Sequence, residues 1–181
     1  VYIPLFFLNY MHKVETEFGK ANGVIVEFPG FKISKRPLFS RGYSVCNAVV
    51  LFGRDYGLLS HFSSEKAHPF EMDGKFEKPS DEFYIDYLID AFAKKVGSLK
   101  DISAVLVGGS YGHLVHNEVR LNLMNIPIIG KSRDKCEIKD RVYPAHHIND
   151  VYPEYPVKSI FVFPKDRRVF VKNDDRYSRI V

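Results

Sequence analysis

Cys46 and His61 are the two side chains whose types and spacing best suit catalysis, since they lie fifteen positions apart within one stretch, residues 40–63. A free thiol has a pKa near about 8.5, so only a few per cent of it is thiolate at neutral pH. An imidazole beside the thiol can take its proton, stabilise the thiolate and later return the proton to a leaving amine. Neighbouring Cys and His side chains are therefore the minimum unit for thiolate catalysis. The alternative is that Cys46 only packs, because free cysteine behaves as a small, buried hydrophobe.

Residues 40–63 have the pattern of a β-hairpin. Residues 44–52 form a near-continuous apolar run, and residues 58–62 form the return strand. The residues between them are typical of a turn: Gly53, Arg54, Asp55 and Gly57. Because the first run is apolar at successive positions, we expect that strand to be buried on both faces.

The register of this hairpin decides whether Cys46 and His61 meet. If Phe52 pairs with Gly57, Cys46 lies opposite Ser63, and His61 lies two positions along the partner strand. Side chains two positions apart share a face, so Cys46 and His61 become diagonal neighbours, about 7–8 Å apart at the backbone. A slip of one residue would put them on opposite faces. The shared face is small and polar, as expected of the floor of a site: Ser44, Cys46, Ala48, His61 and Ser63.

The sequence around this pair resembles the active-site signature of the CheD chemoreceptor glutamine deamidases. The resemblance rests on Ser40, on the sequence Gly-Tyr-Ser-Val-Cys that ends at Cys46, and on the sequence Gly-Leu-Leu-Ser-His-Phe that contains His61. The Cys-to-His spacing is also similar to that in the catalytic domains of cytotoxic necrotising factor toxins. Residues 102–110, which end in Gly-Gly-Ser, resemble the strand before the second helix of CheD. Two positions differ, since Ser40 replaces the usual threonine and Val45 replaces the serine before the cysteine.

This resemblance, which extends over residues 23–172, implies an α/β fold, a mixed β-sandwich with flanking helices, CheD-like. It implies a protein-glutamine deamidase in which the Cys46 thiolate attacks the side-chain amide, His61 transfers protons and Ser40 orients His61. It implies no cofactor and no metal, and as partner a protein substrate that presents a glutamine side chain. We expect residues 1–181 to form a single domain, with residues 1–22 as an N-terminal extension relative to the family.

The setting of such an enzyme follows from the departures from the family. The chain lacks the compact Gly-Leu-Gly-Ser-Cys form typical of CheD, and it carries extra segments at its N-terminus and at residues 64–78. These departures favour a bacterial toxin or effector, which would act in the cytosol of a target cell. A chemotaxis enzyme would instead modify receptors in its own cytoplasm.

The residues leave other functions open. A thiol hydrolase of another amide or of an ester, or a transglutaminase-like enzyme, would form the same acyl-enzyme and differ only in the acceptor. A non-catalytic protein-binding module of the same fold would use Cys46 and His61 for packing. A nucleic-acid-binding domain would use the basic residues near the C-terminus: Arg167, Arg168, Lys172 and Arg176.

The composition bears on nucleic-acid binding, membrane insertion and disulfide bonding. The 26 basic and 22 acidic residues are interspersed, and a net charge of +4 does not by itself predict nucleic-acid binding. No run approaches about 18 apolar residues, so we expect no membrane span. Residues 1–8 lack a basic flank and a cleavage site, and predict a buried strand or helix start rather than a signal peptide. Two cysteines are too few for a disulfide framework, and free thiols suit a reducing compartment. We expect Cys136 to have no part in the chemistry.

The rest of the chain predicts strands with helices between them. We expect helices at residues 5–18, 80–96 and 113–124. We expect strands at residues 23–28, 31–35 and 102–107, another from residue 128, and a final hairpin of residues 158–163 and 168–172. Residues 64–78 are expected to be a loop near the site, and residues 173–181 a loosely held tail.

Two further motifs are candidate sites. The glycine-rich turn at residues 108–112 lacks the Lys-Ser/Thr of a nucleotide-binding loop, and we expect it to allow a close approach of backbone to the site. His113 and His116 stand three positions apart at a helix start. A catalytic zinc needs three protein ligands, and no third one has a recognisable spacing, so we expect surface histidines.

Overall fold

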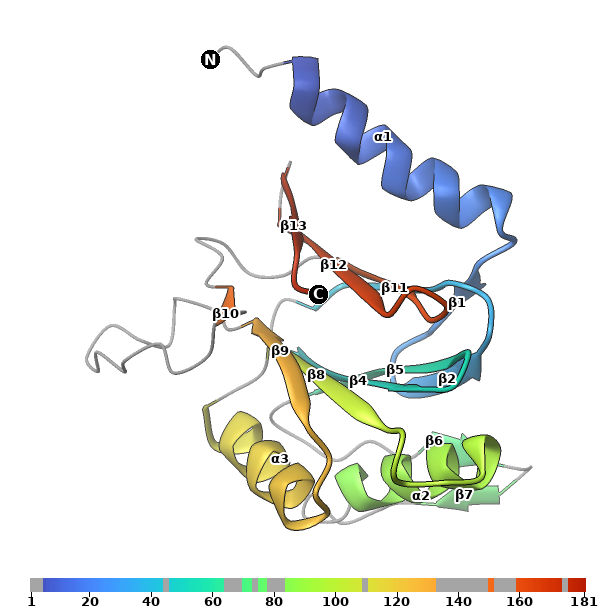
Figure 1. Ribbon diagram of the computed structural model, residues 1–181, viewed down its shortest axis with the longest axis vertical. Helices are drawn as coiled ribbons and strands as arrows, with labels where there is room; N and C mark the ends of the chain where they lie inside the picture. Colours follow the sequence, from blue (N-terminus) through green and yellow to red (C-terminus); the bar gives the residue numbers. More distant parts are fainter. Residues whose placement is uncertain are drawn as a thin grey trace.

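The computed structural model is an α/β fold with two mixed β-sheets and flanking helices (Figure 1). It describes residues 5–43, 46–63, 70–72, 75–77, 84–108, 111–132, 150–151, 159–173 and 176–181. The helices are α1 (Leu5–Lys20), α2 (Tyr84–Val96) and α3 (Tyr111–Leu123). The predicted fold class is confirmed at this level, and all three helices lie where the sequence predicts them.

One sheet has five strands in the order β1-β3-β11-β12-β13. Its strands are β1 (Val24–Ile25), β3 (Leu38–Arg41), β11 (Ser159–Phe163), β12 (Arg168–Asn173) and β13 (Arg176–Arg179). β1 runs parallel to β3, and the other neighbours are antiparallel.

The other sheet has six strands in the order β10-β9-β8-β4-β5-β2. Its strands are β2 (Gly30–Ser34), β4 (Cys46–Gly53), β5 (Tyr56–Ser63), β8 (Ser103–Gly108), β9 (Ile128–Ser132) and β10 (Asp150–Val151). β8, β9 and β10 are parallel neighbours, and the remaining pairs are antiparallel. A separate small sheet pairs β6 (Phe70–Met72) with β7 (Lys75–Glu77).

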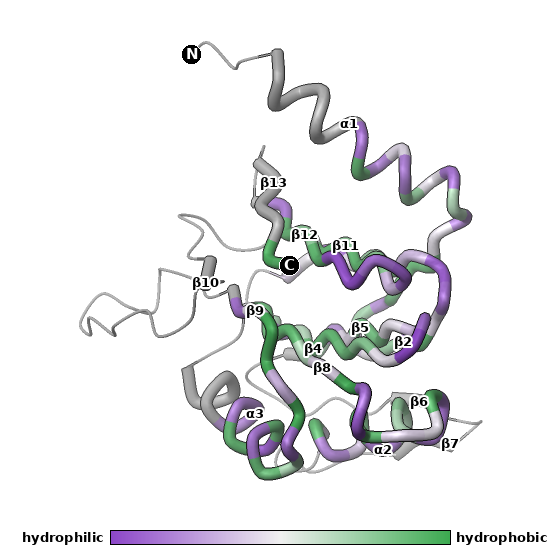
Figure 2. The backbone as a smooth tube through the Cα atoms, viewed as in Figure 1, coloured by the Kyte–Doolittle hydropathy of each residue, from purple (hydrophilic) through white to green (hydrophobic). Residues whose placement is uncertain are grey.

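The two large sheets pack face to face with helices outside them (Figure 1). One core fills the space between the sheets, where Val50 and Leu59 of the six-stranded sheet meet Ile160 of the five-stranded sheet. A second core lies between the six-stranded sheet and α2, which contacts β4, while α3 contacts β8. Figure 2 shows the apolar residues concentrated in these central strands.

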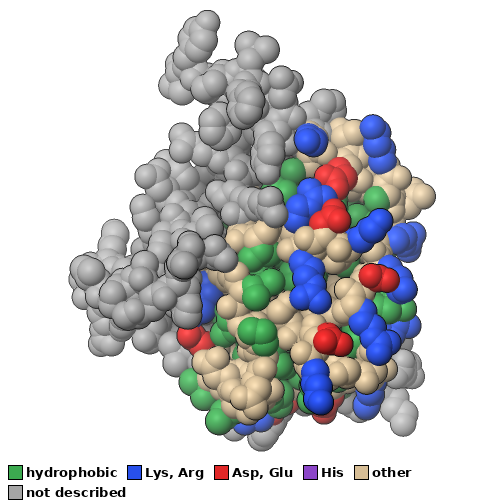
Figure 3. Space-filling view, in the orientation of Figure 1, with side chains coloured by type: hydrophobic (Ala, Val, Ile, Leu, Met, Phe, Trp, Pro, Cys, Tyr) green, Lys and Arg blue, Asp and Glu red, His purple; other side chains and the backbone are tan. Residues whose placement is uncertain are grey.

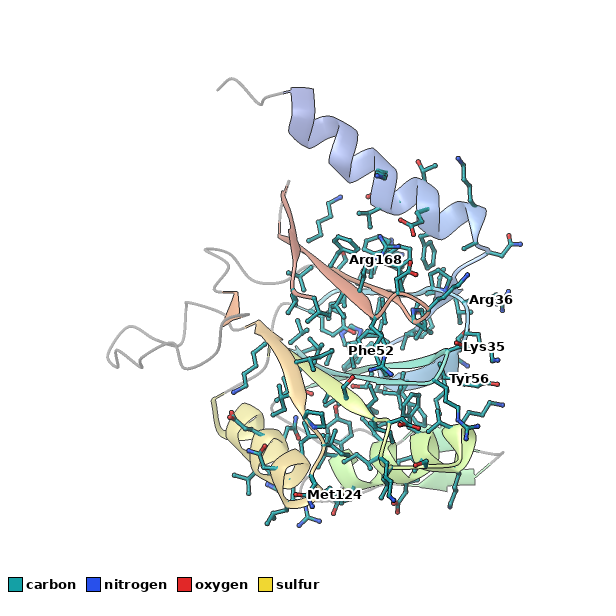
Figure 4. All side chains as sticks on the ribbon, viewed as in Figure 1. Lys35, Arg36, Phe52, Tyr56, Met124 and Arg168 are labelled. Atoms are coloured by element: carbon teal, nitrogen blue, oxygen red, sulfur yellow. The ribbon has the colours of Figure 1, made fainter. Side chains whose placement is uncertain are left out.

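α1 covers the outer face of the five-stranded sheet. Val14 and Phe18 of α1 pack against an aromatic cluster on that face: Phe39, Phe161, Phe163 and Phe170. Arg168 of β12 forms an ion pair with Glu17 of α1, and Figure 4 shows Arg168 between α1 and the sheet. The layers therefore run from helix to sheet, to sheet, to helices.

β4 is the central strand of this arrangement, and all eight of its residues are buried. Side chains alternate across a strand, so Val50 and Phe52 face the other sheet, while Val49 and Leu51 face the helices. A strand that contacts two cores needs apolar residues at successive positions. This explains the continuous apolar run from which the strand was predicted.

The predicted register of the β4–β5 hairpin is confirmed. Phe52 pairs with Gly57 and Cys46 pairs with Ser63. The ladder continues to Gly53 and Tyr56, so the turn is shorter than the four-residue loop expected, but the pairing is the same. The turn end is labelled in Figure 4, where Lys35 lies next to Tyr56, its Nζ atom 4.9 Å from the ring centroid.

Three local predictions differ from the structure. The strand expected at residues 23–28 is limited to β1, and the chain then crosses to the other sheet to form β2. The tail expected to be loosely held contains β13, because Ile180 packs into the core between the sheets and its N–H donates to Val169. The loop expected at residues 64–78 contains the β6–β7 pair. None of the described helices has the length and apolar character needed to cross a membrane.

Candidate active site

The three residues singled out by the sequence lie in the layer between the two sheets. Ser40 is on β3 of the five-stranded sheet, whereas Cys46 and His61 are on β4 and β5 of the six-stranded sheet. β3 contacts β5 across this layer. The side chains are buried, with exposed fractions of 1% for Ser40 and His61 and 7% for Cys46. Two separate sheets therefore contribute to one buried polar site.

Cys46 and His61 share the face that points at the five-stranded sheet. Cys46 belongs to the core between the sheets, and so does Leu59, two positions before His61 on the same face of β5. Because Cys46 pairs with Ser63, His61 is its diagonal neighbour. The structure thus places the predicted pair on one face, as the register requires.

The hydrogen bonds of Ser40 fix the tautomer of His61. The Ser40 hydroxyl donates to the carbonyl oxygen of Val26 at 2.6 Å. Its oxygen also lies 2.9 Å from Nδ1 of His61. A hydroxyl has one proton, which is committed to Val26, so Nδ1 must carry a proton and donate it to Ser40. A neutral His61 therefore presents a free lone pair at Nε2.

Nε2 of His61 is buried and has no hydrogen-bond partner among the residues that the structure describes. Burial disfavours the charged imidazolium and lowers the pKa of His61 to about 4, while the backbone of Gly42 acts in the opposite direction. His61 is thus neutral at pH 7, with an unprotonated Nε2. Nε2 can therefore accept a proton at pH 7, but its low pKa makes it a weaker base than an exposed histidine.

Two aromatic rings hold the His61 ring. The Tyr43 ring stacks on the His61 ring with a centroid distance of 3.8 Å and an interplanar angle of 16°. The Tyr43 hydroxyl donates to the carbonyl of Ser60 at 2.9 Å. Phe28 meets the His61 ring edge-on at 5.0 Å. Tyr43 is buried, but Phe28 is 44% exposed, so Phe28 joins the site to the surface. The sequence predicts no role for either residue, although Tyr43 is part of the motif before Cys46.

Tyr43 also lies close to the thiol. Burial raises the pKa of Tyr43 well above its usual value, the nearby Ser40 side chain acts in the opposite direction, and charge on Tyr84 and on Cys46 raises the pKa further. The N–H of Cys46 donates to the carbonyl of Tyr43 at 3.4 Å. The Tyr43 phenol is therefore neutral and lies within interaction range of both Cys46 and Ser40.

The backbone of Cys46 is tightly packed against β8. Gly108 has a φ of +64°, a backbone conformation that residues other than glycine rarely adopt. A Cβ atom at Gly108 would lie only 2.8 Å from the carbonyl oxygen of Cys46. The predicted close approach of the glycine-rich turn to the site is confirmed at this residue.

The other candidate sites receive less support. No three His, Cys, Asp or Glu side chains gather as a metal site within the described part of the chain. His116 is half-buried on α3, while the His113 side chain and Cys136 lie outside the described residues. Of the basic residues considered for nucleic acid, Arg168 is paired with Glu17 and Asp166, and the Arg176 side chain is outside the described set. Figure 3 shows basic side chains lying among acidic and apolar ones.

No known protein family has a sequence model that matches this chain, and no curated protein sequence matches it either.

Proposed function

We propose that this protein is a cysteine-dependent hydrolase that deamidates glutamine side chains of a protein substrate, with Cys46, His61 and Ser40 as its catalytic group. One observation supports the chemistry most strongly. The hydroxyl proton of Ser40 is committed to Val26, so His61 donates from Nδ1 and keeps an unprotonated Nε2, while the strand register makes Cys46 the diagonal neighbour of His61 on the same face. A nucleophile, a base and a group that orients the base are the parts of a catalytic triad.

The proposed reaction begins with transfer of the Cys46 proton to Nε2 of His61. The sulfur attacks the glutamine amide carbon, and backbone N–H groups near Cys46 stabilise the oxyanion that forms. The C–N bond then breaks, and His61 gives its proton to the leaving ammonia, which leaves a thioester. Water attacks the thioester as His61 takes the water proton, and the thiol is restored when the C–S bond breaks. One water is consumed, and one ammonia and one glutamate side chain are produced.

The burial of His61 sets the order of these events. Because His61 is neutral at pH 7, Cys46 and His61 rest as a neutral pair rather than as a thiolate–imidazolium ion pair. The thiolate is then generated only during the attack, as the thiol proton passes to Nε2 of His61. In this scheme Ser40 stabilises the imidazolium by keeping its oxygen directed at Nδ1.

The glutamine substrate is the part of the proposal that depends on the resemblance to CheD and to the necrotising factor toxins. The resemblance supports a protein partner that inserts a glutamine side chain, with no cofactor. It leaves two settings, a toxin or effector in the cytosol of a target cell, which the departures from CheD favour, and a chemotaxis enzyme in its own cytoplasm.

A second candidate is a non-catalytic binding module of the same fold. It is favoured by the burial of Cys46, which is only 7% exposed and belongs to the core between the sheets. In that protein the thiol would pack like a small apolar side chain and would be chemically inert.

Mass spectrometry in heavy-oxygen water separates these candidates. The protein is incubated with a pool of glutamine-containing proteins, and released ammonia is measured alongside peptides that gained one heavy oxygen. We expect both signals with the wild type and neither with Cys46→Ala. Added primary amine that is incorporated into the peptides would identify a transglutaminase instead. Ammonia release that persists in Cys46→Ala, or that never occurs with the wild type, would contradict the proposal.

A further inference from the structure

Ser60, the residue before His61, opens the β4–β5 ladder beside the catalytic pair. The register puts Val49 opposite Ser60, yet the paired residues pass from Asn47 and Phe62 directly to Val50 and Leu59. The Ser60 hydroxyl takes the place of the missing backbone bonds. It accepts from the N–H of Val49 at 2.8 Å and donates to the carbonyl of Val49 at 3.2 Å. Because a hydroxyl stands between the two backbones, they are held apart at this point.

Because the Ser60 hydroxyl binds the Val49 backbone, the backbone carbonyl of Ser60 is free to accept another hydrogen bond. In a regular ladder that carbonyl would accept from Val49, whose N–H is instead bound to the Ser60 hydroxyl. The released carbonyl accepts from the hydroxyl of Tyr43 at 2.9 Å. Tyr43 stacks on His61, so the opened ladder indirectly fixes the face of the catalytic imidazole.

Tyr84, the first residue of α2, connects the two strands on the side away from the catalytic pair. Its hydroxyl lies 3.1 Å from the Ser60 hydroxyl and donates to the side-chain oxygen of Asn47 at 3.1 Å. Asn47 follows Cys46 in the chain, and Ser60 precedes His61. The ring of Tyr84 packs edge-on against Phe62 at 4.5 Å, so its position does not depend on the hydroxyl alone.

We propose that Ser60 and Tyr84 are positioning residues that set the spacing and orientation of Cys46 and His61 from the back of the sheet. This inference rests on the proposed function, because it assumes that His61 activates Cys46. All these hydroxyls are buried, where hydrogen-bond partners are needed to offset the loss of water. The network joins β4 to β5 and reaches both reacting groups through their immediate chain neighbours, Asn47 and Ser60.

The test is the rate of Cys46 alkylation by iodoacetamide at pH 7, with Cys136→Ser as the common background. We expect Ser60→Ala to lower the rate about tenfold or more, and Tyr84→Phe to lower it about threefold, because small displacements of reacting groups have large kinetic effects. Ser103→Ala is the matched control, since Ser103 is also a buried strand serine and its hydroxyl has no partner among the described residues. We expect it to leave the rate unchanged.

The same variants are then combined with His61→Ala. Since the positioning residues act through His61, neither Ser60→Ala nor Tyr84→Phe should lower the rate further once His61 is absent. If Ser60→Ala does not fold, Tyr84→Phe alone decides the question. A wild-type rate that does not depend on His61 would overturn the proposed function. A His61-dependent rate that neither variant changes, or a fall that persists without His61, would overturn only this inference.

Discussion

The two ends of the β4–β5 hairpin are built from the same two strands but in different ways. At the turn end the ladder is continuous, and Leu51, Phe52 and Leu58 are fully buried. At the other end the ladder is interrupted at Val49, and the buried residues include polar ones, such as Asn47 and His61. The turn end holds the sheets and helices together, whereas the other end carries the candidate chemistry.

This difference shows where the protein accepts a cost in stability. A buried polar atom without a partner costs about 1–3 kcal/mol. Among the described residues, Nε2 of His61 and Nδ2 of Asn47 are two such atoms at the open end, and the Ser103 hydroxyl, opposite Phe52, is one near the turn end. Only the open end combines such atoms with a buried histidine and a buried cysteine, which favours a role for that end beyond packing.

The largest expected effect on stability is at the turn end. Leu58→Ala should lower the free energy of unfolding by about 2–5 kcal/mol, because the lost contacts leave a cavity in a fully packed core. Chemical denaturation measures this loss. The alkylation rate of Cys46 in the folded variant should equal that of the wild type. A large change in that rate would show that the two ends are not independent.

Substitutions of Ser40 test the open end, where we expect a loss of activity and not chiefly of stability. Ser40→Ala should lower the turnover of a glutamine substrate about 10–100-fold, which is the loss seen when the hydrogen-bond partner of a metal-binding histidine is removed. Ser40→Thr, which restores the hydroxyl and the residue usual in CheD, should recover most of the activity. Equal loss of turnover in both variants would mean that the size of the side chain at position 40, and not its hydrogen bond to His61, determines activity.

The pH dependence of stability isolates His61. Its pKa is about 4 in the folded protein and 6.5 when unperturbed, so the unfolded chain binds more protons between these values. Above about pH 6.5 the imidazole is neutral in both states and has no effect of this kind. As the pH falls from about 6.5 to about 4, proton uptake on unfolding lowers the free energy of unfolding, by roughly 1–2 kcal/mol after solvent screening. Denaturation at several pH values should show this loss in the wild type and not in His61→Gln. Identical curves would contradict a buried neutral imidazole.

The smallest expected effect is at the turn itself. Arg54 has a φ of 51°, a conformation that favours glycine. Arg54→Gly should raise the free energy of unfolding by up to about 1 kcal/mol and leave Cys46 reactivity unchanged. Thermal unfolding detects the change, and a clear fall in stability would show that the Arg54 side chain contributes contacts that outweigh the strain.

The hairpin and its register could be predicted because their signals are local. An apolar run, a turn and a return strand in one short stretch place Cys46 and His61 on one face. The contact between Ser40 and His61 could not be worked out in this way, because it joins two different sheets. The role of Ser40 came only from the resemblance.

Other features had no signal in the sequence. Ser60 stands within an apolar run and has the pattern of an ordinary ladder residue, yet its hydroxyl opens the ladder. Tyr43 and Phe28 reach His61 through long-range folding of the chain around β3. β13 has a polar sequence and depends on pairing with β12. Each of these depends on tertiary contacts, which local patterns do not reveal.

The central claim is that His61 activates Cys46, and the pH dependence of Cys46 alkylation by iodoacetamide tests it most directly. The rate is measured in the wild type and in His61→Ala, both with Cys136→Ser. Because His61 is unprotonated above about pH 4, it can remove the Cys46 proton as the sulfur attacks iodoacetamide, so the wild-type rate should change little from about pH 5 to pH 8, and His61→Ala should lower it. A wild-type rate that rises only near the usual thiol pKa, and that does not change without His61, would contradict the claim and leave Cys46 as a packing residue.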